Sequence, residues 1–130
     1  MRKLIEEAVK AMENAYVPYS KFKVGAAVLL KNGEIITGCN IENASYGLCN
    51  CGERTALFKT YSMGYRKDDI VALSVAGATD GPISPCGACR QVMAELMNPR
   101  TPVYLTNTKF DVKEMTVEEL LPYSFSGSDL

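Results

Sequence analysis

The sequence predicts an α/β domain in which helices pack on the faces of a mixed sheet. Three observations predict it: an amphipathic N-terminal segment, two apolar runs that flank Asn32-Gly33, and helical and strand-like segments that alternate after them. A hairpin followed by such alternation implies a mixed sheet covered by helices. The chain has 130 residues, which suits one domain with one core over 1–130.

The first elements are a helix and a hairpin. Apolar residues recur at helical spacing from Leu4 to Ala15, with acidic residues and a lysine on the opposite face. This spacing predicts an amphipathic helix. Residues 22–41 then hold two strand-like runs around Asn32-Gly33. Asn-Gly between apolar runs is the strongest short signal for a hairpin, so the runs are expected to pair.

Helices and strands alternate in the middle of the chain. The run from Cys51 to about Met63 predicts a helix, which Gly64 is expected to end. Residues 69–79, "DIVALSVAGAT", are β-branched and almost wholly apolar, as in a central strand covered on both faces. Residues 86–97, "CGACRQVMAELM", predict another helix.

The last elements are a strand and a short helix. Residues 102–107, "PVYLTN", predict the strand. Thr116 and Glu119 form the pattern of a capping box. In this motif the side chain of each residue accepts a hydrogen bond from the backbone N–H of the other, at the N-terminus of a helix. A short helix over 117–121 is therefore expected.

Composition excludes two classes of partner. The net charge of −1 lacks the basic excess that binding to a nucleic-acid backbone needs. No apolar run approaches the roughly 20 residues of a membrane span, so no nucleic acid and no membrane is expected as a partner. Residues 1–16 carry acids inside their apolar pattern, unlike a signal peptide, and we expect a cytoplasmic protein.

The cysteines point to metal or thiol chemistry. The chain has 5 closely spaced cysteines, an odd number, and disulfides are rare in the cytoplasm. Cys51, Cys86 and Cys89 fall at expected helix N-termini, where free N–H groups lower the pKa of a thiol. The chain has no histidine, so a site for a soft metal must be built from sulfur. Three thiolates could converge on one Zn²⁺ and leave one position open for water.

Two charged residues follow Cys51 directly. Glu53 is placed to lie beside the metal without binding it, and to move protons as a general base and acid. Three thiolates and Zn²⁺ sum to a negative charge, which weakens the metal as a Lewis acid. Arg54 is placed to donate hydrogen bonds to the thiolates and to draw charge from them.

Two other interpretations of the cysteines stay open at this point. The "PCGAC" segment alone would also suit a redox pair at a helix N-terminus. Cys49 could act as a fourth thiolate and close a structural zinc site, if the chain doubled back sharply between Cys49 and Cys51. Neither interpretation gives Glu53 a task. Cys39 and Cys49 are otherwise expected to be small buried hydrophobic residues.

Four segments resemble those of a known family. Cys-x-Glu followed by Pro-Cys-x-x-Cys is the signature of zinc nucleoside and nucleobase deaminases, which may use three cysteines as ligands. In chain order, "YVPYSKFKVGAAVL", "GCNIENASYG", "CGERTALFK" and "PCGACRQV" resemble the small homotetrameric cytidine deaminases over nearly the whole length. "CNIENA" and Phe125 favour this nucleoside family over the related blasticidin-type deaminases.

The resemblance implies a fold, an activity and an assembly. The fold would be a three-layer α/β/α sandwich with a mixed five-stranded sheet. The activity would be hydrolysis of cytidine and deoxycytidine to uridine and deoxyuridine with release of ammonia, a step of pyrimidine salvage. Each chain would hold one Zn²⁺ through Cys51, Cys86 and Cys89, with Glu53 as the catalytic residue, and the chains would form a homotetramer.

The resemblance also implies contacts with the nucleoside. The matching positions are Phe22, Asn40, Glu42, Tyr46, Gly52, Ser84 and Phe125. Asn40 and Glu42 would hold a sugar hydroxyl, backbone at Gly52 and Ser84 would contact the pyrimidine edge, and Phe125 would reach into the site of a neighbouring subunit. Without the resemblance, Asn40 and Glu42 would be interpreted as a turn pair and Phe22 as a core residue.

Gly52 departs from the family pattern, which usually has alanine at this position. Glycine in a helix costs roughly 0.5 to 1 kcal/mol relative to alanine.

Overall fold

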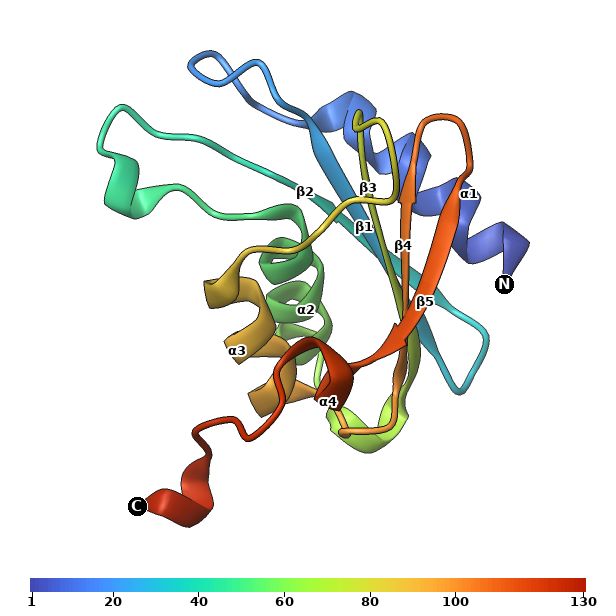
Figure 1. Ribbon diagram of the computed structural model, residues 1–130, viewed down its shortest axis with the longest axis vertical. Coiled ribbons are helices and arrows are strands. Elements are labelled where there is room, and N and C mark those ends of the chain that lie inside the picture. Colours follow the sequence, from blue (N-terminus) through green and yellow to red (C-terminus); the bar gives the residue numbers. More distant parts are fainter.

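A five-stranded mixed sheet forms the centre of the computed structural model, which describes residues 1–130 (Figure 1). The strands are β1 (Val24–Leu30), β2 (Ile35–Cys39), β3 (Ile70–Gly77), β4 (Pro102–Asn107) and β5 (Val112–Thr116). They follow the order β2-β1-β3-β4-β5, in which only β3 and β4 pair in parallel. The predicted mixed sheet is confirmed.

Helices cover both faces of this sheet and complete three layers. Helix α1 (Arg2–Ala11) lies on one face, and α2 (Gly52–Ser62), α3 (Gly87–Leu96) and α4 (Val117–Leu120) lie on the other (Figure 1). This arrangement confirms the expected α/β/α sandwich. No helix combines the length and the apolar character that crossing a membrane would need.

Each face of the sheet has its own apolar core. Val28 of β1 points into the larger core, under α2, α3 and α4, while its neighbour Ala27 points into the smaller core under α1. Small residues, including Ala72 and Ala76 of β3, let α1 lie close to the strands. All of β3 except Val71 is buried, as expected for a strand covered on both faces.

The first helix is shorter than its spacing predicts. Regular α-helix ends at Ala11 and a 3-10 turn follows over Met12–Asn14, so that Ala15 is extended. The Tyr16 N–H donates to the carbonyl of Asn40 at 3.0 Å and draws the chain alongside the segment that follows β2. Tertiary pairing therefore overrides the helical pattern at this end.

The predicted turn and cap residues have the expected backbone. Gly33 has φ +90° in the loop between β1 and β2, and Gly64 has φ +98° directly after α2. The N–H of Tyr65 reaches back to Thr60 O at 3.3 Å, the bond of a Schellman motif, and glycine allows the left-handed conformation it needs. Thr116 and Glu119 form both hydrogen bonds of the predicted capping box.

Strand β5 is the element that local patterns do not predict. It pairs with β4 at the edge of the sheet, and Val112, Lys113 and Glu114 are exposed. A mostly exposed edge strand lacks the alternation of apolar and polar residues that marks a half-buried one. The fifth strand follows only from the family resemblance.

Candidate active site

Two helix N-termini bring three cysteine sulfurs together. Cys51 is the N-cap residue of α2 and Cys86 is the N-cap residue of α3, while Cys89 lies in the first turn of α3. The Cys51 and Cys86 sulfurs are 3.9 Å apart, and those of Cys86 and Cys89 are 3.2 Å apart. All three sulfurs lie within 4.8 Å of one another. The predicted placement at helix starts is thus what gathers residues 35 or more positions apart in sequence.

The cluster and its arginine stabilise a thiolate on Cys51. A hydrogen bond from the Cys89 thiol and the Arg54 guanidinium together lower the pKa of Cys51 to about 5. The same hydrogen bond, together with burial, raises the pKa of Cys89. Cys51 is therefore the first of the two to lose its proton, and it presents the negatively charged sulfur that a metal ion needs.

Arg54 lies in the first turn of α2, and its guanidinium contacts the cysteine cluster. Its Nη2 donates to the Cys51 sulfur at 3.2 Å. Its Nε is buried and has no hydrogen-bond partner. A buried donor without a partner destabilises the fold. The Arg54 guanidinium is therefore held at this place chiefly by its attraction to the negatively charged sulfurs.

The donor set fits zinc. With Zn–S bonds of about 2.3 Å, sulfurs of a tetrahedral site lie about 3.8 Å apart, near the 3.9 Å between Cys51 and Cys86. Cys49 lies outside this group: its sulfur accepts from the Asn43 N–H at 3.3 Å. Cys49 is also not buried, contrary to expectation, since it lies at intermediate exposure with Cys39. Without a fourth sulfur the set matches catalytic zinc sites, which keep one position open, and not a closed structural site.

Glu53 lies beside the cluster in the first turn of α2. Its side chain is only 3% exposed, yet it reaches the wall of a cavity that Cys51 and Cys86 also line. Burial raises the pKa of Glu53. A carboxyl group that ionises nearer neutrality is suited to both accepting and returning a proton.

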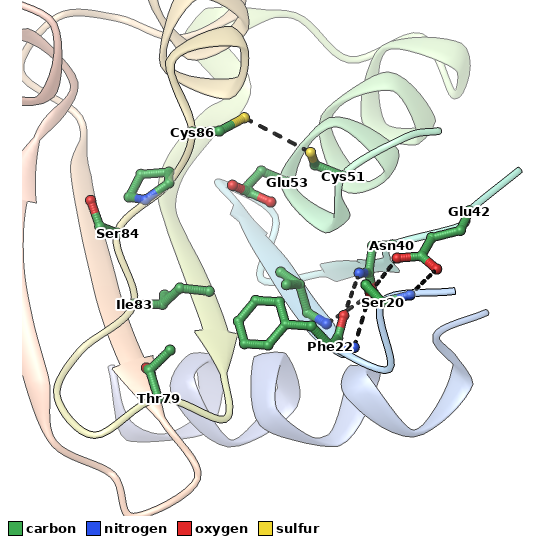
Figure 2. Close-up of a pocket in the computed structure, with 12 residues that line it drawn as sticks. Ser20, Phe22, Asn40, Glu42, Cys51, Glu53, Thr79, Ile83, Ser84 and Cys86 are labelled. Atoms are coloured by element: carbon green, nitrogen blue, oxygen red, sulfur yellow. Dashed lines mark hydrogen bonds between the residues drawn. The ribbon is translucent and has the colours of Figure 1, made fainter. Parts of the chain in front are cut away.

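The cavity has a volume of about 560 Å³, within the usual range of small-molecule sites. Figure 2 shows Cys51, Cys86 and Glu53 at one end of it and Phe22, Ile83 and Thr79 at the other. Its lining residues are Ser20, Phe22, Val24, Asn40, Glu42, Cys51, Glu53, Thr79, Ile83, Ser84, Pro85 and Cys86.

Asn40 and Phe22 line the cavity together. The Asn40 side chain accepts from the Val24 N–H at 2.9 Å and donates to the Phe22 carbonyl at 2.8 Å. These bonds hold the chain that enters β1 and so set the position of the Phe22 ring. Asn40 therefore makes the backbone contacts expected of a turn residue. It also lines the cavity, where the family resemblance predicts that it contacts the sugar.

Glu42 binds the backbone of residues 19 and 20. Its carboxylate accepts from the N–H groups of Tyr19 and Ser20, both at 3.1 Å, and from the Ser20 hydroxyl. The hydrogen bond from the Ser20 side chain, with those from backbone N–H groups, lowers the pKa of Glu42. An ionised carboxylate therefore faces the cavity beside Asn40.

Ser84 and Gly52 lie near the cysteines. Ser84 lines the cavity, and its hydroxyl accepts from Arg90 at 2.7 Å. Gly52 is buried at the start of α2, against Val24. A Cβ at Gly52 would lie 3.1 Å from both the carbonyl oxygen and a methyl group of Val24, so α2 approaches β1 closely at this position.

Gly52 is not among the residues that line the cavity, and two further predicted contacts lie outside the cavity of this chain. Tyr46 is 73% exposed in a 3-10 turn and packs edge-on against Tyr19, with ring centroids 6.1 Å apart. Phe125 is 61% exposed on the C-terminal segment, which leaves the body of the molecule after α4 (Figure 1). Their predicted contact with substrate would require another subunit.

Some lining residues carry no sequence signal for this role. Thr79 and Ile83 belong to the loop between β3 and α3. The predicted strand over 69–79 runs two residues past the end of β3 and so includes Thr79, while Ile83 lies in a segment with no predicted element. Ser20 and Val24 flank the predicted Phe22. Pro85 precedes Cys86 in the zinc-site signature. The one available signal for Thr79 and Ile83 is position, since they follow the carboxyl end of a central strand, where α/β folds place ligands.

Known proteins match the chain along its length. Residues 1–105 match the family described as "Cytidine and deoxycytidylate deaminase zinc-binding region". The cytidine deaminase of Halalkalibacterium halodurans is 61% identical over 127 residues, which are 98% of this chain and 95% of that protein. The cytidine deaminase of Sporosarcina psychrophila is 58% identical over 130 residues, 100% of this chain and 94% of that protein.

A solved structure has the same fold. The crystal structure of cytidine deaminase from Burkholderia pseudomallei superposes with a TM-score of 0.93 and 56% identity, covering 95% of this chain and 98% of that chain. The matched family is zinc-binding, and Cys86 and Cys89 lie with Cys51 in one group that could hold a metal ion, which favours a zinc site over the redox interpretation of "PCGAC". The chain belongs to the cytidine and deoxycytidylate deaminase zinc-binding family.

Proposed function

We propose that the protein is a zinc-dependent cytidine deaminase. It hydrolyses cytidine and deoxycytidine to uridine and deoxyuridine with release of ammonia, as a step of pyrimidine salvage. The observation that carries this function is a carboxylate, Glu53, only 3% exposed, on the wall of a cavity that is also lined by Cys51 and Cys86 of the three-sulfur cluster. Relatives that are 58% and 61% identical over nearly the whole chain are cytidine deaminases.

Glu53 carries the protons of the reaction. Zinc held by Cys51, Cys86 and Cys89 supplies a Lewis acid, which makes water a competent nucleophile near neutral pH. Glu53 takes one proton from the attacking water and gives it to N3 of the ring, and it then takes the second proton from the oxygen on C4 and gives it to the departing amine. A C4–O bond forms and the C4–N4 bond breaks, so that water and cytidine become uridine and ammonia.

Arg54 adjusts the charge of the sulfurs. Its hydrogen bond to Cys51, at 3.2 Å, draws electron density from that sulfur. Three thiolates donate strongly to a metal ion, and this guanidinium offsets part of that donation.

The cavity selects a nucleoside over a nucleotide. No lysine or arginine is among its lining residues, while Glu42 and Glu53 are. Asn40 and the ionised Glu42 line one side of the cavity together with Ser20 (Figure 2), where sugar hydroxyls can donate to them. A phosphate group on the sugar would add negative charge beside Glu42 without a cation to balance it.

The working assembly is a homo-oligomer, and a homotetramer by resemblance to the family. Support comes from Phe125 and Tyr46, two predicted substrate contacts that are exposed and outside this chain's own cavity. The proposed location is the cytoplasm, because a reducing compartment keeps the cysteines of the zinc cluster unoxidised.

A turnover assay with metal analysis tests the function. The purified protein is expected to contain one zinc per chain and to deaminate cytidine, followed by the change in ultraviolet absorbance. Deoxycytidine should also be converted, whereas deoxycytidine 5′-phosphate should be converted poorly. Absence of turnover in zinc-loaded protein would contradict the assignment, and efficient turnover of the phosphate would contradict the selectivity.

Glu53→Gln is the matched variant in that assay. It preserves the size of the side chain but cannot carry a proton, so turnover should fall by about 10² to 10⁴-fold while zinc content stays at the wild-type level. Cys49→Ser is the control, and both its zinc content and its turnover should equal those of the wild type.

A further inference from the structure

Arg90 spans two segments of the chain from one position on α3. Its Nε donates to the Pro85 carbonyl at 2.8 Å, its Nη2 donates to the Ser84 hydroxyl at 2.7 Å, and its Nη1 donates to the Leu120 carbonyl at 2.9 Å. Every nitrogen of the guanidinium is thus bonded, and the side chain is only partly exposed.

The two segments differ in their relation to the cavity. Ser84 and Pro85 form part of its wall, whereas Leu120 is the last residue of α4 and does not line it. The carbonyl groups in the last turn of a helix lack partners within that helix, so Leu120 O is an available acceptor on a packed element. Leu120 itself is 3% exposed and belongs to the larger core.

We propose that Arg90 is a positioning residue for substrate binding. It ties Ser84 and Pro85, which form part of the cavity wall, to the buried C-terminal end of α4. This part of the wall is therefore ordered before the nucleoside binds. The inference rests on the proposed function, because it concerns the binding of that substrate. Neither Arg90 nor Leu120 lines the cavity, and Arg90 acts only through the residues that it holds.

The role depends on the shape of the guanidinium. Three nitrogens in a fixed plane reach three acceptors on two segments at once. The ammonium of lysine keeps the charge but donates from a single atom, so it cannot span the same acceptors. Arg90→Lys therefore loosens the wall without removing the positive charge.

Loosening the wall should weaken substrate binding more than the chemical step. Glu53 and Cys51 are carried by α2, to which Arg90 makes no hydrogen bond. Ordering a mobile wall at the moment of binding lowers affinity in the ground state and transition state alike, which raises KM and leaves kcat nearly unchanged.

Arg66→Lys is the matched control. Arg66 also donates to two backbone carbonyls, those of Tyr61 at 3.1 Å and Tyr65 at 2.7 Å, and its guanidinium lies 5.1 Å from the centre of the Tyr61 ring. None of these residues lines the cavity. The control therefore changes another arginine that holds backbone carbonyls, both through its Nη1, at a site that is unrelated to substrate.

The experiment compares KM, kcat, zinc content and melting temperature of the wild type and both lysine variants, with cytidine as substrate. Arg90→Lys should raise KM by about ten-fold, with kcat and zinc content within about two-fold of the wild type. Arg66→Lys should lower the melting temperature but leave KM within about two-fold. Equal KM values for the two variants, or a loss of kcat or zinc at unchanged KM, would overturn the proposal.

Ser84→Ala provides an independent arm if Arg90→Lys does not fold. It removes one acceptor of Arg90 and leaves the backbone of the wall, so KM should rise by about three-fold. Where Arg90→Lys does fold, the two effects should add to less than their sum in the double variant, because both changes remove the hydrogen bond between Arg90 and Ser84. Strict additivity, or no change of KM in Ser84→Ala, would contradict the proposal. A wild type without turnover would overturn the proposed function itself, which separates the two failures.

Discussion

Two carboxylates of the cavity, Glu53 and Glu42, ionise differently because their surroundings differ. Burial raises the pKa of Glu53, while hydrogen bonds from the Ser20 hydroxyl and backbone N–H groups lower the pKa of Glu42. Two carboxyl groups with pKa values driven apart can take separate roles in one site. Glu53 is suited to move a proton, and Glu42 is suited to remain an acceptor for hydroxyl groups throughout turnover.

The lowered pKa of Glu42 predicts a stability difference that depends on pH. A carboxyl group whose pKa falls on folding stabilises the fold above its unfolded pKa of about 4.3, and this contribution is lost as pH falls through the folded pKa. Glu42→Gln should therefore lower the melting temperature most near pH 7. The gap from the wild type should shrink as pH falls below about 4.3.

Thermal unfolding from pH 7 down to about pH 3 measures this gap. Glu114→Gln, which alters an exposed carboxylate on β5, is the control and should give a small difference at every pH. A gap for Glu42→Gln that stays constant over the whole range would show that the side chain acts through its shape and not through its charge.

Asn107 joins three elements at the end of β4. Its side-chain N–H groups donate to the carbonyls of Thr79 and Asp80 at 3.0 and 3.1 Å and to the Asp111 carboxylate at 2.9 Å. Its oxygen accepts from the N–H groups of Lys109 and Asp111, both at 3.0 Å. The residue is fully buried. It therefore fixes the loop after β3, which carries Thr79 into the cavity, to the turn between β4 and β5.

Removing this amide should destabilise the fold strongly. Asn107→Ala takes the partner from two loop carbonyls, two N–H groups and a carboxylate at once, and the free energy of unfolding should fall by about 2 to 4 kcal/mol. Denaturant unfolding at a fixed protein concentration measures the loss. Asn98→Ala is the control: Asn98 makes one side-chain bond, to Asp68 at 3.0 Å near the surface, and its loss should change stability by less than about 1 kcal/mol. Equal effects of the two variants would refute the role of Asn107.

At the scale of the whole molecule, elements and positions with a strong local pattern could be predicted from the sequence. The central strand Ile70–Gly77 and the cysteines at two helix N-termini are examples. Strand β5 could not, because its side chains are mostly exposed. Thr79 and Ile83 could not, because the Asn107 amide reaches Thr79 across 28 positions, and only the folded sheet brings such residues together.

The exposed ring of Phe125 on the C-terminal segment leads us to expect that active sites are shared between subunits. Gln91 holds the Phe125 carbonyl at 3.0 Å, yet the ring itself is 61% exposed, and an exposed aromatic ring on such a segment is suited to a partner surface. If each site uses Phe125 of a neighbour, Phe125→Ala should raise KM for cytidine much more than it lowers the melting temperature. Tyr123→Ala is the control, since Tyr123 is a fully exposed aromatic residue on the same segment.

Mixed assemblies give the sharper test. When Phe125→Ala and Glu53→Gln chains are co-expressed in equal amounts, random association puts an intact Glu53 beside a neighbour's intact Phe125 in about a quarter of the sites. Activity at low cytidine concentration should then exceed the sum of the two parents measured separately. A mixture of Tyr123→Ala with Glu53→Gln should show no such excess, because Tyr123→Ala sites keep every group the reaction is proposed to use. Strictly additive activity in the Phe125→Ala mixture, or a monomer by light scattering at the assay concentration, would mean that each chain completes its own site.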